Sequence, residues 1–147
     1  MSLFTGVFEC KLDAKGRLTL PSKVKARLPE VSGNMVMLNM VANEPFLELY
    51  PLVEARKIYN KIAALDPLDK DARDLQRFML GQLSETELDT AGRVLIPKHM
   101  IAHASLDREI SLVGVGSRLE IWDSQKYFER RAKDGQAYEE LIKKYLS

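Results

Sequence analysis

Two short stretches of the chain place an aspartate four residues before an arginine, with a glycine directly before that arginine. They run from Asp13 to Arg17 (Asp-Ala-Lys-Gly-Arg) and from Asp89 to Arg93 (Asp-Thr-Ala-Gly-Arg). An aspartate can accept hydrogen bonds from backbone N–H groups further along its own turn, and glycine readily adopts the positive φ that such turns require. Arginine carries a planar fork of donors that suits phosphate groups and guanine edges. The pattern therefore predicts two tight turns, each presenting a cation.

Some residues of these turns are candidates for contact with a polyanion, and the others are expected to form the turns. The candidates for contact are Lys15, Arg17 and Arg93. The expected turn formers are Asp13, Gly16, Asp89 and Gly92. Each arginine could instead serve only to pair with the aspartate of its own turn, and the spacing leaves both interpretations open. Ala91 stands where the first copy has Lys15, so the first turn is expected to contribute more to binding.

The two aspartates could alternatively be a catalytic pair that shares one proton, as in aspartic proteases. The sequence Asp89-Thr90-Ala91-Gly92 has a faint likeness to the Asp-Thr-Gly loop of that class, but an alanine intervenes. The first turn lacks the hydroxyl residue and has Lys15 nearby. Because turn-forming aspartates explain the pattern, we predict no catalytic residue and no enzymatic activity.

Composition argues against several other classes of protein. The 147 residues contain no apolar run near the roughly 18 residues that a membrane span needs. The first residues lack the basic and apolar regions of a secretion signal, so none is expected. The one cysteine, Cys10, permits no internal disulfide and fits a reducing cytoplasm. Together with His99 and His103 it offers too few ligands for a structural zinc site, and no phosphate-binding loop indicates a nucleotide, so neither metal nor cofactor is predicted.

Charge is distributed unevenly, although the net charge is only +1. Residues 1–30 carry more basic than acidic side chains, and a locally positive surface is what binding to nucleic-acid phosphates requires. The basic residues are Lys11, Lys15, Arg17, Lys23, Lys25 and Arg27, and the acidic ones are Glu9, Asp13 and Glu30. Solvated lysines that merely keep a small domain soluble would give the same composition.

An internal repeat organises the chain. Residues 12–21 recur as 88–97, and Leu-Glu-Leu-Tyr at 47–50 parallels Leu-Glu-Ile-Trp at 119–122, the first copy being longer by four residues, which we expect in the loop near 42–44. Each copy predicts a β-turn-β-α-β-β half. In the first, the strands lie near 8–12, 17–20, 35–39 and 46–50, and a helix opens at Pro21 and stops at Pro29. In the second, the last two strands lie near 110–113 and 118–122.

About fifty residues bury too little surface to be stable alone, so we expect the two halves to intertwine in an α+β fold. Between them, apolar spacing predicts a helix over 52–65 and a second one that is capped by Asp69 and reaches Leu83. A third helix is expected from Asp123, interrupted at Gly135 before a last amphipathic segment. The expected division is 1–51 for the first repeat, 52–82 for the helical connection, 83–123 for the second repeat and 124–147 for the C-terminal helical segment.

The paired motifs, Asp-x-x-Gly-Arg followed by proline, closely resemble those of the MraZ family of the AbrB/SpoVT-like superfamily. Further matching stretches are Leu-Tyr-Pro at 49–51, Arg-Phe-Met-Leu-Gly at 77–81, Leu-Val-Gly-Val-Gly at 112–116 and Glu-Ile-Trp-Asp at 120–123. The likeness extends over nearly the whole chain to about Tyr127.

The resemblance implies a transcriptional regulator, here a repressor, of the bacterial division and cell-wall gene cluster. Such a protein binds short repeats in double-stranded promoter DNA, associates with the nucleoid in the cytoplasm and forms ring-shaped homo-oligomers, with no membrane or small-molecule substrate. The family's DNA-contacting motif falls on Lys15, Arg17 and Arg93. The alternative is a non-catalytic oligomeric scaffold whose basic turns bind an acidic protein partner.

Overall fold

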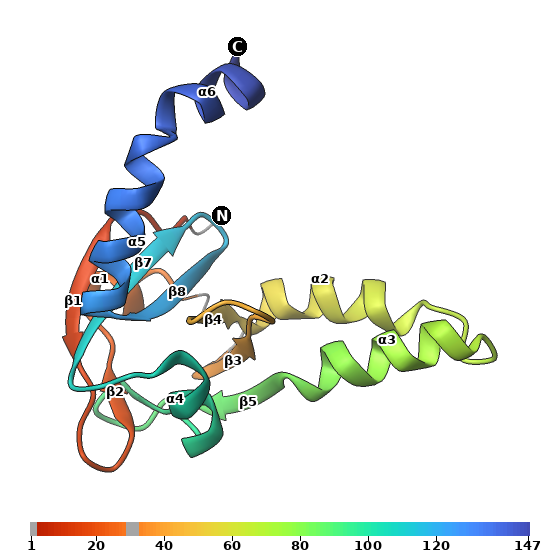
Figure 1. The fold of residues 1–147 in the computed structure, drawn as a ribbon. Helices are drawn as coiled ribbons and strands as arrows, with labels where there is room; N and C mark the ends of the chain where they lie inside the picture. The colour runs from red at the N-terminus through yellow and green to blue at the C-terminus, as the bar shows by residue number, and fades with distance from the viewer. Residues whose placement is uncertain (1–2, 29–32) are drawn as a thin grey trace.

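The computed structural model describes residues 3–28 and 33–147, in which a six-stranded antiparallel sheet, a two-stranded ribbon and several helices are formed (Figure 1). The first repeat contains β1 (Val7–Lys11), β2 (Arg17–Thr19), α1 (Ser22–Lys25), β3 (Met35–Met40) and β4 (Leu47–Pro51). The connection contains α2 (Leu52–Ala63) and α3 (Lys70–Gly81). The second repeat contains β5 (Leu83–Glu87), β6 (Arg93–Leu95), α4 (Lys98–Ala104), β7 (Glu109–Val115) and β8 (Arg118–Asp123), followed by α5 (Ser124–Gln136) and α6 (Tyr138–Leu146).

The six-stranded sheet is built by strand exchange between the two repeats. Its order is β1-β7-β8-β4-β3-β5, so the first strand of each repeat pairs with the third strand of the other. The registers are equivalent: Cys10 of β1 lies opposite Ile110, and its counterpart Thr86 of β5 lies opposite Val36. The two repeats are therefore intertwined, which confirms the predicted α+β fold of tandem, pseudo-symmetric halves.

The ribbon of β2 and β6 obeys the same pseudo-two-fold symmetry. Leu18 lies opposite its counterpart Val94, and both are fully buried. Leu20 and Ile96, one on each side, also lie in the core. The ribbon thus anchors its apolar side chains between the two halves while its ends carry the two turns.

Cys10 belongs to this core, as its place on an alternating strand predicted. It is 8% exposed, and burial, with a smaller effect of Glu9, raises the pKa of its thiol to about 11. A thiol that stays protonated at neutral pH is a poor nucleophile, so Cys10 acts as a small apolar residue.

The four-residue difference between the repeats is divided between two places, rather than falling only near 42–44 as expected. Leu38 and Leu112 are equivalent because they pair with Leu49 and Ile121 respectively, which are themselves equivalent. The hairpin between β3 and β4 therefore accounts for two of the extra residues, and the segment before β3 accounts for the other two. The expected helix stop at Pro29 lies outside the described residues.

The helices follow the predicted order but differ at two boundaries. Asp69 caps α3 by accepting from the backbone N–H of Asp71 and Ala72, as predicted. The helix ends at Gly81, however, and Leu83 already belongs to β5, where ladder hydrogen bonds to β3 replace helical ones. The C-terminal helix is interrupted before a last helical segment, as predicted, but the break lies at Ala137 and not at Gly135, through which α5 continues to Gln136. A single helical glycine costs only about 1 kcal/mol.

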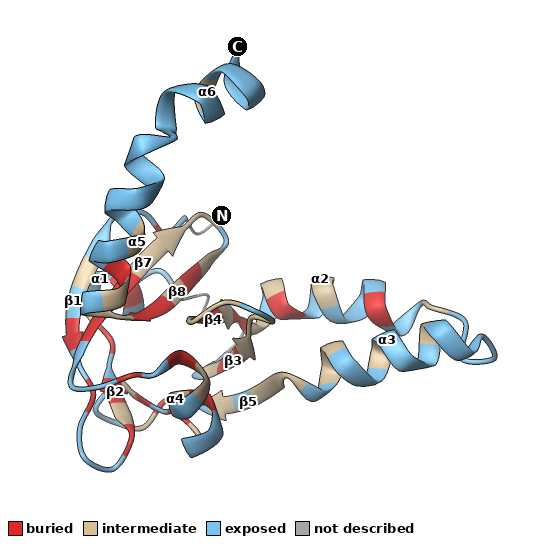
Figure 2. Cartoon of the chain, in the orientation of Figure 1, coloured by how far each residue is buried: buried red, intermediate tan, exposed pale blue. Residues whose placement is uncertain are grey.

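Two pairs of helices project from the sheet in different directions (Figure 1). The α2–α3 hairpin extends away from β4 and β5, and α5 leads from β8 into α6 at the C-terminus. Neither α3 nor α6 has a buried residue, and Figure 2 shows both as exposed or partly exposed. Within residues 3–28 and 33–147, no helix has the length and apolarity needed to cross a membrane.

Candidate nucleic-acid interface

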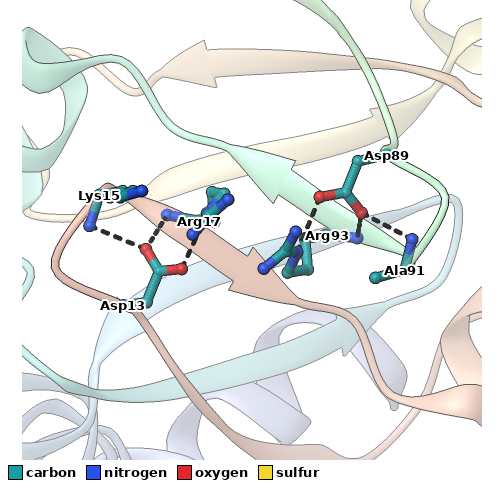
Figure 3. A network of polar contacts seen from close by, with 6 residues as sticks. All are labelled: Asp13, Lys15, Arg17, Asp89, Ala91 and Arg93. Atoms are coloured by element: carbon teal, nitrogen blue, oxygen red, sulfur yellow. Dashed lines mark hydrogen bonds and ion pairs between the residues drawn. The ribbon is translucent and has the colours of Figure 1, made fainter.

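The first turn is held together by the Asp13 side chain (Figure 3). Its Oδ1 accepts from the backbone N–H of Lys15 and of Arg17, each at 2.9 Å, and its Oδ2 accepts from Arg17 Nε at 2.9 Å. Gly16 has a φ of +82° and donates its N–H to the Asp13 carbonyl at 3.0 Å. The aspartate thus fixes both the backbone of the turn and the direction of the arginine.

The second turn has the same construction (Figure 3). Asp89 Oδ1 accepts from the backbone N–H of Ala91 and of Arg93, each at 2.9 Å, and its Oδ2 accepts from Arg93 Nε at 2.7 Å. Gly92 has a φ of +75° and donates to the Asp89 carbonyl at 2.9 Å. The structure therefore gives Asp13, Gly16, Asp89 and Gly92 the turn-forming positions that the sequence predicted.

The aspartates do not have the electrostatics of a proton-sharing pair. The pKa of Asp13 and that of Asp89 are both lowered, foremost by the backbone N–H of Arg17 and of Arg93 respectively. In a carboxylate dyad one pKa is instead strongly raised by the neighbouring charge. In Figure 3 the two arginines lie between the two aspartates. The hypothesis of a protease-like pair therefore finds no support in the geometry.

Each arginine pairs with its own aspartate and yet retains donors for a ligand. The side chains of Arg17 and Arg93 are 31% and 32% exposed, and each ion pair uses only Nε. The terminal guanidinium nitrogens make no hydrogen bond to other described residues, so two N–H groups at each are available. The aspartate orients the guanidinium, and the exposed end of the fork can meet a phosphate or a base edge.

The two turns are fixed relative to each other through the ribbon. Leu20 donates its backbone N–H to the Gly92 carbonyl at 3.1 Å, and Ile96 donates to the Gly16 carbonyl at 2.8 Å. Each turn glycine is thus bonded to the strand end of the other repeat. The structure brings Lys15, Arg17 and Arg93 into one unit whose spacing is set by backbone hydrogen bonds.

A different side chain packs on the glycine of each turn. A methyl group added at Gly16 would lie 3.3 Å from Ile101 Cδ1, whereas one added at Gly92 would lie 2.5 Å from Lys25 Cδ. Ile101 on α4 and Lys25, the last residue of α1, occupy equivalent positions of the repeat. In the sequence, Lys25 stands out only as one of several basic residues of the N-terminal segment. The available signal was the mismatch between a lysine and an isoleucine at one repeat position.

The candidates for metal binding are not brought together. Within the described residues, no group of three or more His, Cys, Asp or Glu side chains could hold a metal ion. His103 instead makes a 2.9 Å hydrogen bond through Nε2 with the carbonyl of Val41.

Two strand-exchanged β-turn-β-α-β-β halves, each with an Asp–Arg turn, define an intertwined α+β fold with a pair of cationic turns. Comparison with known proteins agrees with this class. The family model described as "MraZ protein, putative antitoxin-like" matches twice, over residues 3–78 and 79–141. The chain belongs to the MraZ family.

Curated relatives match nearly from end to end. A protein named transcriptional regulator MraZ from Cytophaga hutchinsonii is 38% identical over 147 residues, covering 100% of this chain and 97% of the relative. Proteins of the same name from Proteus mirabilis and Marinobacter nauticus are 38% and 39% identical, covering 90% and 86% of this chain and 87% and 85% of their own lengths. The name these relatives carry is that of a regulator and not of an enzyme class.

Proposed function

We propose that this chain is a sequence-specific, DNA-binding transcriptional regulator that represses the bacterial division and cell-wall gene cluster. It binds repeated boxes in double-stranded promoter DNA, and it acts in the cytoplasm in association with the nucleoid. Its curated relatives carry the name of transcriptional regulators, which supports the regulatory role.

The observation that carries the proposal is the pair of matched turns at the ribbon. Each presents an arginine whose Nε is held by an aspartate and whose terminal nitrogens remain exposed. Lys15 adds an exposed ammonium to the first turn. Because the turns are joined by backbone hydrogen bonds, their cations meet DNA with little loss of conformational freedom, and preorganised contacts lose less affinity on binding.

We further propose that the chain assembles into a ring that repeats these turns. A single chain with a net charge of +1 offers few cations, so one copy alone should bind weakly. The α2–α3 hairpin leaves several large apolar side chains exposed, and these are suited to contacts between subunits. They are Val53, Tyr59, Leu68, Leu75 and Phe78.

Titration of the protein against a duplex from the region upstream of its own gene tests the function. We expect a saturable shift that weakens steeply with added salt and that exceeds the shift of a scrambled duplex. The variant Arg17→Ala/Arg93→Ala, with an unchanged circular dichroism spectrum, should lose the shift. A parent protein that binds neither duplex, but retains an acidic protein from a lysate in a salt-sensitive way, would favour the scaffold alternative.

A further inference from the structure

We propose that Lys25 is a DNA-contacting residue of the second turn, supplied by the other repeat in place of the lysine that Ala91 lacks. The ligand is a backbone phosphate of the duplex bound by the turns. This inference rests on the proposed DNA-binding function and adds to it a cation that the repeated motif itself does not contain.

The Lys25 side chain lies on the glycine of the second turn. A methyl group placed on Gly92 would lie 2.5 Å from Cδ, 3.1 Å from Cε and 2.7 Å from Nζ of Lys25. The whole outer part of the side chain therefore lies across the glycine of the second turn. Gly92 is buried under it while Lys25 itself is exposed, so the methylene groups cover the backbone and the ammonium remains in reach of solvent.

The equivalent place on the first turn is occupied by an apolar side chain. There Ile101 covers Gly16, with Cδ1 at 3.3 Å from the position of an added methyl group. The first turn contains Lys15, and the apolar side chain of Ile101 packs on its glycine. The second turn contains Ala91 instead, and the cationic side chain of Lys25 packs on its glycine. Each turn has one arginine from its own motif and one lysine, which is Lys15 from the same repeat or Lys25 from the other.

Lys25 borders a hollow that contains further groups able to bind phosphate. A hollow of about 450 Å³ lies beside the second turn and is lined by Lys25, Asn34, Thr90 and Gly92 among others. Asn34 and Thr90 are exposed and bring an amide and a hydroxyl, which both hydrogen-bond phosphate oxygens. Asp89 also lines the hollow, but its carboxylate already accepts three hydrogen bonds within its own turn.

The equivalent hollow beside the first turn differs in chemistry. It has a volume of about 300 Å³, and Ala14, Ile101 and Asp107 stand at the places of Thr90, Lys25 and Gly33. Its basic residue is Arg108, which also lines a second hollow beside the same turn, together with Arg17. The second hollow is the one whose cation lies directly on the turn glycine.

The test compares the charge-removing variant Lys25→Gln with Lys23→Gln by fluorescence anisotropy on the promoter duplex over a salt series. Lys23 is also an exposed lysine of helix α1, but it borders the N-terminal residues Phe4 to Phe8 and not an Asp–Arg turn. We expect Lys25→Gln to reduce the slope of log affinity against log salt by roughly 0.9 for each Lys25 that contacts DNA. The Lys23→Gln slope should equal that of the parent, and equal slopes for the two variants would overturn the proposal.

A rescue experiment separates loss of charge from loss of structure. Introducing Ala91→Lys into Lys25→Gln restores a lysine to the second turn from within its own motif, so it should restore the parent slope. A double variant that remains as weak as Lys25→Gln overturns the inference. The variant Arg17→Ala/Arg93→Ala separates a failure of the proposed function from a failure of the role of Lys25. If this variant binds DNA like the parent, the proposed function itself fails. If it loses binding while Lys25→Gln binds like the parent, only the role of Lys25 is removed.

Discussion

The two turns of this chain have the same internal hydrogen bonds but take their lysine side chains from different positions. Asp13 and Asp89 make the same three hydrogen bonds, and the distances differ by no more than 0.2 Å. Position 15 is lysine and position 91 is alanine, yet Lys25 lies on Gly92 where Ile101 lies on Gly16. In an intertwined fold, the chemistry around a turn therefore cannot be judged from the turn's own motif, because half of the residues around it come from the other repeat.

The largest expected effect concerns how many turns act together. Phe78 on α3 is 57% exposed, and Phe78→Glu should dissociate the proposed ring while leaving both turns intact. Affinity for a repeated operator should then fall by roughly 10²–10⁴, because the second contact is no longer intramolecular. Mass photometry and anisotropy on the same samples measure both quantities.

Leu141→Glu is the matched control, since Leu141 on α6 is also an exposed apolar residue, at 47%. It should leave mass and affinity unchanged. A folded, monomeric Phe78→Glu protein that binds the repeated operator as tightly as the parent would show that the two turns of one chain suffice.

The next effect concerns the two arginines. Removal of either should cost roughly 1–3 kcal/mol of DNA-binding free energy if it contacts a base edge. From the motif alone Arg17→Ala should be the more harmful, because only the first turn has its own lysine. With Lys25 on the second turn we expect the two single variants to be similar, and the inequality to emerge only in a Lys25→Gln background.

Competition binding to one duplex makes this measurement. The four proteins compared are Arg17→Ala and Arg93→Ala, each with Lys25 present and each combined with Lys25→Gln. A large difference between Arg17→Ala and Arg93→Ala with Lys25 present would mean that the first turn dominates by its own motif. In that case the contribution of Lys25 would be minor.

Much of this arrangement was accessible from the sequence because it is local. The aspartate, glycine and arginine of each turn lie within five residues, and the apolar alternation of the strands has a period of two that is readable in short windows. The intertwining of the halves followed only from a size argument, and its registers did not follow at all. Lys25 and Gly92 are far apart in sequence and meet only through strand exchange, so no local pattern could relate them.

The boundary errors have a similar cause. Leu83 continues the apolar spacing of α3, and only its pairing with Asn39 of β3 assigns it to the sheet. Gly135 is a weak helix former, yet the helix continues through it and is interrupted only at Ala137. In both cases contacts or neighbours beyond the residue's own propensity decide its conformation.

The variants Gly16→Ala and Gly92→Ala should differ in free energy of unfolding, and this difference should be smaller than the effects described above. Alanine at either position takes on left-handed strain of roughly 1–2 kcal/mol. At Gly16 the atom nearest to the added methyl group is the Ile96 carbonyl oxygen at 3.1 Å, whereas at Gly92 the three nearest atoms all belong to the flexible Lys25 side chain. Urea unfolding should therefore find Gly16→Ala the less stable variant.

DNA binding should separate the same two variants in another way. Gly92→Ala displaces Lys25 and should therefore reduce the slope of log affinity against log salt. Gly16→Ala displaces Ile101 and no lysine, so it should leave that slope unchanged. Equal free energies of unfolding and equal salt dependence of DNA binding for the two variants would mean that Ile101 and Lys25 play equivalent roles on their turns.

The smallest expected effect is a pH dependence that the two turns should share. The pKa of Asp13 and that of Asp89 are depressed in the folded chain below the ordinary value of 3.8, first by the backbone N–H of the following arginine. A depressed carboxyl pKa contributes stability that is present above the unfolded value and is lost as the pH falls through the folded one. Asp13→Asn and Asp89→Asn should therefore each flatten the decline in unfolding free energy below about pH 4, and by the same amount.

Asp74 on α3 provides the control for this last comparison. Its pKa is lowered by the side chains of Lys70 and Arg77, which are exposed, so its contribution should disappear at about 1 M salt, where the screening length is about 3 Å. The contributions of Asp13 and Asp89 should persist at that salt, because backbone donors carry no net charge to be screened. If one of the two turn aspartates loses its contribution with salt and the other does not, the turns differ in their skeletons as well as in their cations.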